Sequence, residues 1–247
     1  MKPKTAPRPG VLIILYHRVN DELPENALVI RTERFAEQMA YLKSSPLLGE
    51  VISLRDWEER PDYYYQLPNP AYLKIIITFD DGYRDNFTNA FPVLRQWNLP
   101  ASFFLATGMI DTGKKFARYA ANPERDMLNL KEIAEMADQG MTFGPHTQNH
   151  VHLTALSPEE QQREIHPSCD YIQEHIAPGS RLNTFCYPYG EYNSATIEIL
   201  RAARIRHALT VRPGKNTIDT PSYELRRVEI SGIDSIQTFK TKLTQWA

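Results

Sequence analysis

Two adjacent carboxylates at the end of an apolar run are the first residues whose types could do chemistry. Asp80 and Asp81 follow the run Ile75-Ile76-Ile77-Thr78-Phe79 and precede Gly82. Two carboxylates held close together repel each other, so one takes up a proton or a cation lies between them. A turn at the glycine would let both face one pocket. A solvated turn at a strand end explains this run equally well.

Two histidines four residues apart form a second candidate. His146 and His150 lie in the stretch Gly-Pro-His-Thr-Gln-Asn-His. On a helical turn this spacing places both imidazoles on one face. With one carboxylate they would form a two-histidine, one-carboxylate metal site with open positions for water and substrate. Such a pair on a surface turn usually has no role, but here it follows a predicted strand, as the aspartates do. His152 is expected to be a neighbour of the site and not a ligand.

A third stretch, Tyr187-Pro188-Tyr189-Gly190, follows an apolar run in the same way. Its proline and glycine favour a tight turn that could present backbone N–H groups to a developing oxyanion. Turns of this composition also occur as packing corners, so this stretch alone indicates little.

The elements that must position these turns alternate along the chain. Apolar runs predict strands over residues 11–16, 51–54, 74–79, 101–106, 141–143, 183–187, 207–211 and 225–230. Amphipathic periodicity predicts helices over 32–43, 86–97, 129–139, 158–175 and 194–203, with Pro167 expected to kink or divide the fourth. Alternation of this kind predicts an α/β fold with about seven parallel strands, either open or closed into a barrel. The strand ends that carry the three motifs would then share one rim.

The chain reads as one domain over residues 11–247, preceded by a ragged, proline-bearing leader over 1–10. No internal repeat and no Gly/Ser-rich linker marks a boundary inside it. Residues 62–72, which include three consecutive tyrosines, and residues 111–126 are expected to be surface loops.

The composition excludes several classes of protein. With 247 residues, of which 42% are hydrophobic and 23% charged, the chain has enough apolar material for a core and is not a disordered polymer. A net charge of −2 provides no basic surface for nucleic acid. No apolar run approaches the roughly 18 residues that cross a bilayer. The two cysteines, Cys169 and Cys186, could form at most one disulfide and leave the redox compartment open.

Taken together, the three motifs resemble those of polysaccharide deacetylases of carbohydrate esterase family 4, which carry the NodB homology domain. The likeness rests on Thr-Phe-Asp-Asp-Gly, His-Thr-Gln-Asn-His and Tyr-Pro-Tyr-Gly in this order, and it spans most of the chain. The opening Tyr16-His17-Arg18-Val19 and the Tyr-Pro-Tyr-Gly form are most similar to the branch that deacetylates the biofilm exopolysaccharide poly-β-1,6-N-acetylglucosamine.

The resemblance implies a role for each matched residue. Asp81, His146 and His150 would bind a divalent metal, zinc with cobalt or nickel as substitutes. Asp80 would be the general base, and the backbone N–H of Tyr189 would hold the oxyanion. Substrate contacts would come from Tyr187, Pro188 and Arg18. The family fold is a distorted (β/α) barrel with fewer than eight complete units.

The sequence departs from the family pattern at two points. The late Leu-x-His motif, which supplies a general acid in many members, is absent. An arginine that tethers the catalytic aspartate is also missing from the region before the Pro-Tyr-Gly turn. His17, at the end of the first predicted strand, is therefore the leading candidate for acid or substrate contact, with a hydrogen bond to backbone as the alternative.

The expected function is metal-dependent removal of N-acetyl groups from an N-acetylglucosamine polymer, with poly-β-1,6-N-acetylglucosamine as the first choice of substrate. Chitin oligomers, peptidoglycan and acetylxylan are alternative substrates. A catalytically silent sugar-binding domain is the alternative from another class. The protein is expected to act as a monomer outside the cell or at its surface, with a polysaccharide and not a nucleic acid as its partner.

Overall fold

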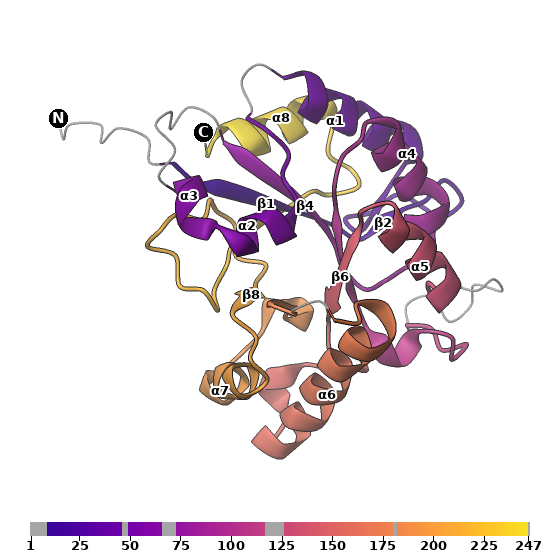
Figure 1. Ribbon diagram of the computed structural model, residues 1–247. Helices are drawn as coiled ribbons and strands as arrows, with labels where there is room; N and C mark the ends of the chain where they lie inside the picture. Colours follow the sequence, from indigo (N-terminus) through magenta and orange to yellow (C-terminus); the bar gives the residue numbers. More distant parts are fainter. Residues whose placement is uncertain (1–8, 46–48, 66–72, 117–125, 180–181, 247) are drawn as a thin grey trace.

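A parallel sheet forms the centre of the computed structural model, which describes residues 9–45, 49–65, 73–116, 126–179 and 182–246 (Figure 1). Five strands lie in the order β6-β5-β4-β1-β9, and every pairing between them is parallel. Their bounds are β1 Val11–Tyr16, β4 Lys74–Phe79, β5 Ser102–Leu105, β6 Thr142–Pro145 and β9 Arg227–Glu229. The fold is therefore α/β, as predicted.

The predicted seven-stranded barrel is not confirmed, because two of the expected strands form a sheet of their own. β7 (Thr184–Cys186) pairs only with β8 (His207–Leu209) among the described residues, and a further short pair joins β2 (Arg18–Val19) to β3 (Val29–Ile30). At the β6 edge Pro145 has no N–H to donate. A side chain at Gly144 would collide with the Phe104 ring and crowd the Thr184 carbonyl of β7. The two sheets therefore approach there through close packing and not through a ladder.

Helices surround the sheet (Figure 1). Those on its outer face contribute buried side chains to the largest apolar cluster: α1 Thr32–Ser44, η1 Asn86–Ala90 with α4 Phe91–Gln96, α5 Leu130–Asp138 and α8 Ile236–Thr244. Those beside β7 share a smaller cluster with it: α6 Pro158–Tyr171 and α7 Ser194–Ala202. The five predicted helices are confirmed with small shifts of their ends, and α8 is an addition to them.

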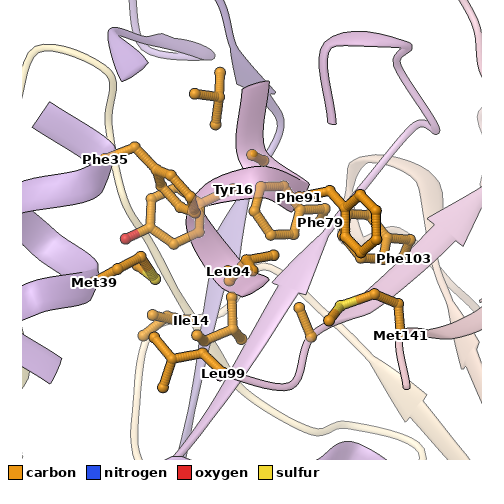
Figure 2. Packing of buried hydrophobic residues seen from close by; sticks show 14 of the residues in the cluster. Ile14, Tyr16, Phe35, Met39, Phe79, Phe91, Leu94, Leu99, Phe103 and Met141 are labelled. Atoms are coloured by element: carbon orange, nitrogen blue, oxygen red, sulfur yellow. The ribbon is translucent and has the colours of Figure 1, made fainter. Parts of the chain in front are cut away.

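Aromatic rings fill the outer core between the sheet and these helices (Figure 2). Tyr16 and Phe79, at the ends of the paired strands β1 and β4, stack on each other, and Phe35 of α1 meets both rings edge-on. Phe103 of β5 stacks on Phe79 with ring centroids 4.8 Å apart. Burial of each ring removes a large apolar area from water, so this cluster fixes where β1 and β4 end.

The inner face of the sheet has its own apolar cluster, which two short helices close at the amino-terminal end. Trp57 of α2 (Leu54–Glu59) and Tyr64 of α3 (Pro61–Tyr65) pack with the inward side chains of the strands. The predicted strand over 51–54 is wrong: only a single bridge joins Val51 to Ile75, and Ser53 caps α2 instead. The predicted loop over 62–72 begins as α3, and its residues 66–72 lie outside the described part, as do leader residues 1–8 and residues 117–125 of the second loop.

Pro167 does not divide the helix, which was one of the two outcomes predicted for it. Helix α6 runs through Pro167 without interruption and then continues as the wider η5 turn, Ile172–Ile176. Pro167 and Arg163, whose carbonyl loses its intrahelical donor, both lie on the exposed side of the helix. Water can satisfy that carbonyl there, so the helix continues.

Cys169 and Cys186 are both buried and free, so the structure contains no disulfide between them. No helix within the described residues has both the length and the apolar character needed to span a membrane.

Candidate active site

The three sequence motifs meet at the carboxyl end of the sheet, each on a turn that follows β4, β6 or β7. The chain reverses sharply in all three turns. Seven non-glycine residues of the described part have a positive φ, and four of them lie here: Asp81, Thr147, His150 and Tyr189. Such backbone is unfavourable for L-residues and persists only where its surroundings impose it. The strained backbone therefore coincides with the residues that could do chemistry.

Asp81, His146 and His150 form a compact set of metal-ligating atoms. The Nε2 atom of His150 lies 3.0 Å from Asp81 Oδ1, and the Nε2 atom of His146 lies 3.5 Å from the same oxygen. All three side chains are buried, and their ligand atoms lie within 4.8 Å of one another. One carboxylate oxygen and two imidazole nitrogens suit zinc and its neighbours in the first transition series. The residues present therefore fit the divalent metal that the sequence predicts.

The orientation of His146 supports this assignment. Its Nδ1 atom lies 2.8 Å from the backbone carbonyl of Cys186, and a carbonyl can only accept, so Nδ1 carries the proton. In the neutral imidazole, the form that binds a metal, the lone pair then lies on Nε2, the atom that faces Asp81. A carbonyl on the outer nitrogen is a common way to fix the tautomer of a metal-bound histidine.

The histidine turn is not the helical turn that the spacing suggested. Residues 146–152 form no regular helix, and positive φ angles at Thr147 and His150 bring the two imidazoles to 4.9 Å, centroid to centroid. The turn is held by Thr107 and Gly108, whose N–H groups donate to the carbonyls of Thr147 and Gln148. A side chain at Gly108 would collide with the Gln148 carbonyl.

The electrostatics of the set follow from burial and from the pairing of opposite charges. Burial alone would raise the pKa of Asp81, but the hydrogen bonds from His146 and His150 hold it well below its usual range. Burial would likewise lower the pKa of His146, and its contacts with Cys186 and Asp81 raise it instead. In this pocket a cationic partner for the carboxylate is strongly favoured.

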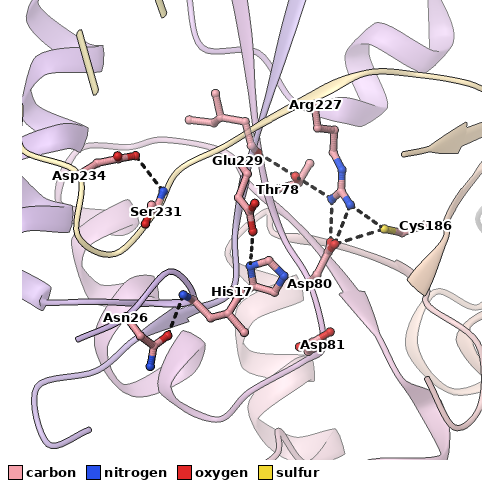
Figure 3. Close-up of polar contacts among 12 residues, drawn as sticks. His17, Asn26, Thr78, Asp80, Asp81, Cys186, Arg227, Glu229, Ser231 and Asp234 are labelled. Atoms are coloured by element: carbon pink, nitrogen blue, oxygen red, sulfur yellow. Dashed lines mark hydrogen bonds and ion pairs between the residues drawn. The ribbon is translucent and has the colours of Figure 1, made fainter. Parts of the chain in front are cut away.

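Asp80, the predicted base, points to the other side of the turn and is held by Arg227 (Figure 3). Arg227 donates from Nη1 to Asp80 Oδ1 at 2.8 Å and from Nη2 to Oδ2 at 2.6 Å. The Cys186 thiol lies 3.4 Å from the same Oδ2. Burial raises the pKa of Asp80, but the Arg227 guanidinium, together with His146 and His17, lowers it overall. The carboxylate is therefore ionised and fixed in orientation.

Asp80, His146 and Cys186 also lie close enough to hold an ion. The two Asp80 oxygens are already used by Arg227, and burial raises the pKa of the Cys186 thiol. A thiol must lose its proton to become a ligand, so this second set fits a metal less well.

The turn after β7 carries Tyr189 and lies beside His150. Gly190 donates to the Tyr187 carbonyl and Glu191 to the Pro188 carbonyl, whereas the Tyr189 N–H has no hydrogen-bond acceptor among the described residues. The Tyr189 ring lies edge-on to His150 at 4.7 Å. An unpaired N–H beside a metal site is the arrangement that an oxyanion requires.

His17 lies directly after β1 on the same rim, between Glu229 and the aspartates (Figure 3). Its Nδ1 atom is 3.9 Å from a Glu229 carboxylate oxygen, and its side chain is 14% exposed. The backbone carbonyl of His17 accepts a hydrogen bond from Asn86. Nδ1 of the ring has no hydrogen-bond partner among the described residues, so the alternative of a hydrogen bond from the imidazole to backbone is not borne out for this atom.

The comparison with known families decides which protein class this site represents. The sequence profile of the family described as Polysaccharide deacetylase matches residues 70–208, more than half of the chain. The chain belongs to the polysaccharide deacetylase family. This deacetylase is therefore a carbohydrate esterase family 4 hydrolase that acts on N-acetyl amide bonds, a class that depends on a metal. The resemblance drawn from the motifs is confirmed.

Relatives and solved structures extend the likeness over almost the whole deacetylase. YxkH of Bacillus subtilis (strain 168) is 26% identical over 231 residues, 92% of this chain and 74% of YxkH. The poly-beta-1,6-N-acetyl-D-glucosamine N-deacetylase of Staphylococcus epidermidis is 23% identical, over 96% of this chain and 83% of its own. The structure of IcaB from Ammonifex degensii matches with a TM-score of 0.74 and 25% identity, covering 97% and 98% of the two chains. The Streptococcus pyogenes deacetylase PplD in complex with acetate shares the fold, with a TM-score of 0.79 at 23% identity over 95% of this chain and 98% of PplD.

Two of the expected substrate contacts lie inside the deacetylase and not on its surface. Arg18 is 2% exposed, ion-paired with Asp85 and Asp126 and stacked over the Tyr83 ring. Tyr187 is fully buried and donates from its hydroxyl to the Tyr223 carbonyl at 3.2 Å. These positions argue for structural roles, because a side chain without solvent contact cannot meet a polymer.

Pro188 is buried as well, so its contribution is the shape of the turn. By contrast, 43% of the Tyr189 side chain is exposed at the rim. Of the turn residues, Tyr189 is thus the one placed to meet substrate.

The sequence reading missed Arg227 as the tether of the catalytic aspartate. It sits on β9, which pairs with β1, and it reaches past β1 to Asp80 at the end of β4. One signal was available: in the predicted strand 225–230 Arg227 shares a face with the apolar Leu225, and an arginine on a buried face must be paired. Glu229, on the same side of β9 two residues further on, was missed as well.

Proposed function

We propose that the protein is a metal-dependent N-deacetylase of N-acetylglucosamine polymers, with poly-β-1,6-N-acetylglucosamine as its substrate. The observation that carries the reaction is the pairing of a buried Asp81–His146–His150 set with an ionised Asp80 one residue away. A base beside a metal set is what amide hydrolysis by activated water needs. The substrate follows from the likeness to the Staphylococcus epidermidis N-deacetylase and to IcaB.

A bound divalent ion, for which we propose zinc, would polarise the acetyl carbonyl and lower the pKa of water. Asp80 accepts the proton of the attacking water, and its bidentate pair with Arg227 keeps the accepting oxygens in place. The Tyr189 N–H donates to the oxygen of the carbonyl as negative charge develops there. The C–N bond then breaks, giving acetate and the free amine of glucosamine.

The leaving nitrogen needs a proton, and His17 is the proposed donor. It lies on the same rim as Asp80, and Glu229 stands beside its Nδ1 atom. A carboxylate at that position can orient the imidazole ring, so that the other ring nitrogen, Nε2, would hold the proton for the leaving amine. The pair of His17 and Glu229 would replace the histidine of the absent Leu-x-His motif.

Two departures from the family pattern favoured the alternative of a catalytically silent sugar-binding domain, and one of them no longer holds. The missing tether favoured it, and Arg227 supplies that tether from β9. A protein that only binds sugar gains nothing from an oriented, ionised carboxylate beside a metal set. Binding of polymer without acetate release is the result that would favour this alternative.

The test is acetate release from β-1,6-linked N-acetylglucosamine oligomers by protein that has been stripped with a chelator and then resupplied with zinc, cobalt or nickel. Release that depends on the metal supports the proposal. The Asp80→Asn variant, which keeps the shape of the side chain, should bind metal and release no acetate. If chitin oligomers or peptidoglycan are processed faster than the β-1,6 oligomers, the substrate assignment is wrong and the reaction class stands. Faster release from the acetyl esters of acetylxylan would overturn the assignment of amide hydrolysis as well.

The wider setting remains part of the proposal. A substrate of this size points to action outside the cell or at its surface, with the polysaccharide as partner and residues 11–247 as one monomeric catalytic domain. Size-exclusion chromatography with light scattering tests the monomer, and extraction of a culture into medium, surface and interior fractions tests the location.

A further inference from the structure

Two exposed aromatic rings lie stacked beside the metal set, and the reaction as derived above uses neither of them. The rings of His152 and Tyr189 are parallel, with an interplanar angle of 4° and centroids 3.8 Å apart. The His152 side chain is 55% exposed and that of Tyr189 43%. In every other stacked pair of rings among the described residues, such as Phe79 on Phe103, at least one ring is buried. Packing of the core therefore does not account for this pair.

The stack is held rigidly by polar contacts on the side of His152. Its Nδ1 atom lies 3.0 Å from Oε2 of Glu191, and the Thr154 hydroxyl donates to the same oxygen at 3.1 Å. Glu191 directly follows the η6 turn (Pro188–Gly190), so the residue that holds His152 and the residue that stacks on it lie on one short segment. Both of these hydrogen bonds use Oε2 of Glu191. Among the described residues no hydrogen bond to Oε1 is found, so this oxygen can accept one from a ligand.

The place of the stack fixes what it can contact. Tyr189 touches the metal-set residue His150 edge-on, and His152 lies on the face of Tyr189 as a second layer. A chain whose acetyl group reaches the metal set must continue across neighbouring surface. The stack is exposed aromatic surface that directly contacts the metal set, through the Tyr189 and His150 rings.

We propose that the His152–Tyr189 stack is a subsite for the pyranose ring next to the one that is deacetylated. The inference rests on the proposed function, because it takes a sugar polymer as the ligand. Pyranose rings present C–H groups on their faces, which pack on aromatic rings, and hydroxyls at their edges, which suit a carboxylate such as Glu191. The subsite recognises a neutral hexose polymer of at least two units and makes His152 a specificity-determining residue.

Steady-state kinetics with β-1,6-linked N-acetylglucosamine oligomers tests the subsite. Truncation in His152→Ala should raise KM by about 3- to 10-fold, the range expected for loss of one aromatic contact, while kcat changes by less than about twofold. His152→Phe retains a flat ring and should restore KM. The matched control is His175→Ala. Like His152, His175 is about half exposed (51%) and packs on a tyrosine ring, that of Tyr171, but it lies near the carboxyl end of the helical segment 158–176.

An unchanged KM in His152→Ala overturns the proposal, and so does a His152→Phe variant that behaves like the alanine variant, since stacking would then not be the interaction. Metal content and thermal stability are measured for each variant to show that the site is intact. A second measurement separates this proposal from the proposed function. If the wild-type protein releases no acetate, calorimetric titration with the same oligomers still decides it: weaker binding in His152→Ala supports the subsite, and equal binding overturns it.

Discussion

Asp80 depends on a single buried arginine for both its charge and its orientation. Arg227 is fully buried and pairs with both carboxylate oxygens, and its Nε donates to the Thr210 carbonyl. Removal of one partner from such a pair leaves an uncompensated buried charge. The rate of the reaction should therefore be sensitive to the geometry of this pair as well as to Asp80 itself.

The Arg227→Lys variant keeps the positive charge and loses the two parallel hydrogen bonds. We expect kcat to fall by about 10- to 100-fold, the usual effect of disturbing a residue that supports a metal site, with metal content unchanged. Acetate release and metal analysis on the same samples check this. Arg212→Lys is the matched control, because Arg212 pairs with Glu224 at 3.0 Å on an exposed surface and should tolerate the change. A folded Arg227→Lys protein with the wild-type rate would exclude the tether.

His17 offers a second test at the level of one side chain. If it protonates the leaving amine, His17→Ala should lower kcat by about 10²- to 10⁴-fold while the metal content stays the same. Glu229→Gln should give a smaller loss, since it removes only the charge beside Nδ1. His166→Ala, a change on the outer part of α6, serves as the control. Unchanged turnover in His17→Ala would end its candidacy as the acid.

At the scale of elements, the two sheets are joined at the end remote from the catalytic rim by α2, which packs against β8. The ring of His207 on β8 lies 4.8 Å from that of Trp57 on α2. Glu58 of α2 accepts hydrogen bonds from Asn183 and Thr184 at the start of β7. These contacts take the place of the strand ladder that a closed barrel would provide.

His207 makes this junction sensitive to acid. Burial, with a smaller contribution from Arg206, lowers the pKa of His207 from 6.5 to about 4. The folded protein therefore binds this proton less tightly than the unfolded chain does. The free energy of unfolding therefore has its full value, as far as His207 is concerned, above pH 6.5. It decreases by at most about 3 kcal/mol as the pH falls from 6.5 to 4.

Urea denaturation at pH 7.5 and 4.5 measures this contribution. The midpoint of the wild-type protein should fall more than that of His207→Gln, which has no proton to gain. Equal losses in the wild-type and His207→Gln proteins would show that His207 does not titrate in this range.

At the scale of the whole molecule, the metal set joins segments that are far apart in sequence. Asp81 follows β4, whereas His146 and His150 follow β6, and all three become neighbours only in the folded chain. An ion that binds this set binds the native state and not the unfolded one. Binding of a metal at this site should therefore raise the free energy of unfolding of the whole domain.

Removal of the metal with a chelator should lower the melting temperature, and resupply should restore it. Excess metal at about 100 to 1,000 times its dissociation constant would add about 3–4 kcal/mol to the free energy of unfolding. The Asp81→Asn variant tolerates the positive φ at this position and should show little or no shift. A wild-type melting temperature that changes neither with chelator nor with added metal would contradict a metal site here.

Much of the site was predictable because strand ends carry it. The apolar run before Asp80, the short run before His146 and the run before Tyr187 each predict a strand, and parallel strands place their carboxyl ends on one rim. The sequence alone therefore determined the α/β class, the family, and the assembly of the two aspartates and two histidines. These depend on local order along the chain, which a sequence displays directly.

Only the tertiary structure decided the contacts between strands that are distant in sequence. Arg227 reaches Asp80 across β1, Arg18 lies inside an ion-paired cluster and away from substrate, and His152 stacks on Tyr189. Each of these depends on sheet order and on backbone reversal at positive φ. The split of seven strands into a sheet of five and a pair has the same origin, since close packing of Gly144 against Phe104 and Thr184 replaces a ladder there. Residue type and spacing carry no record of such pairings, because they arise only when distant segments pack.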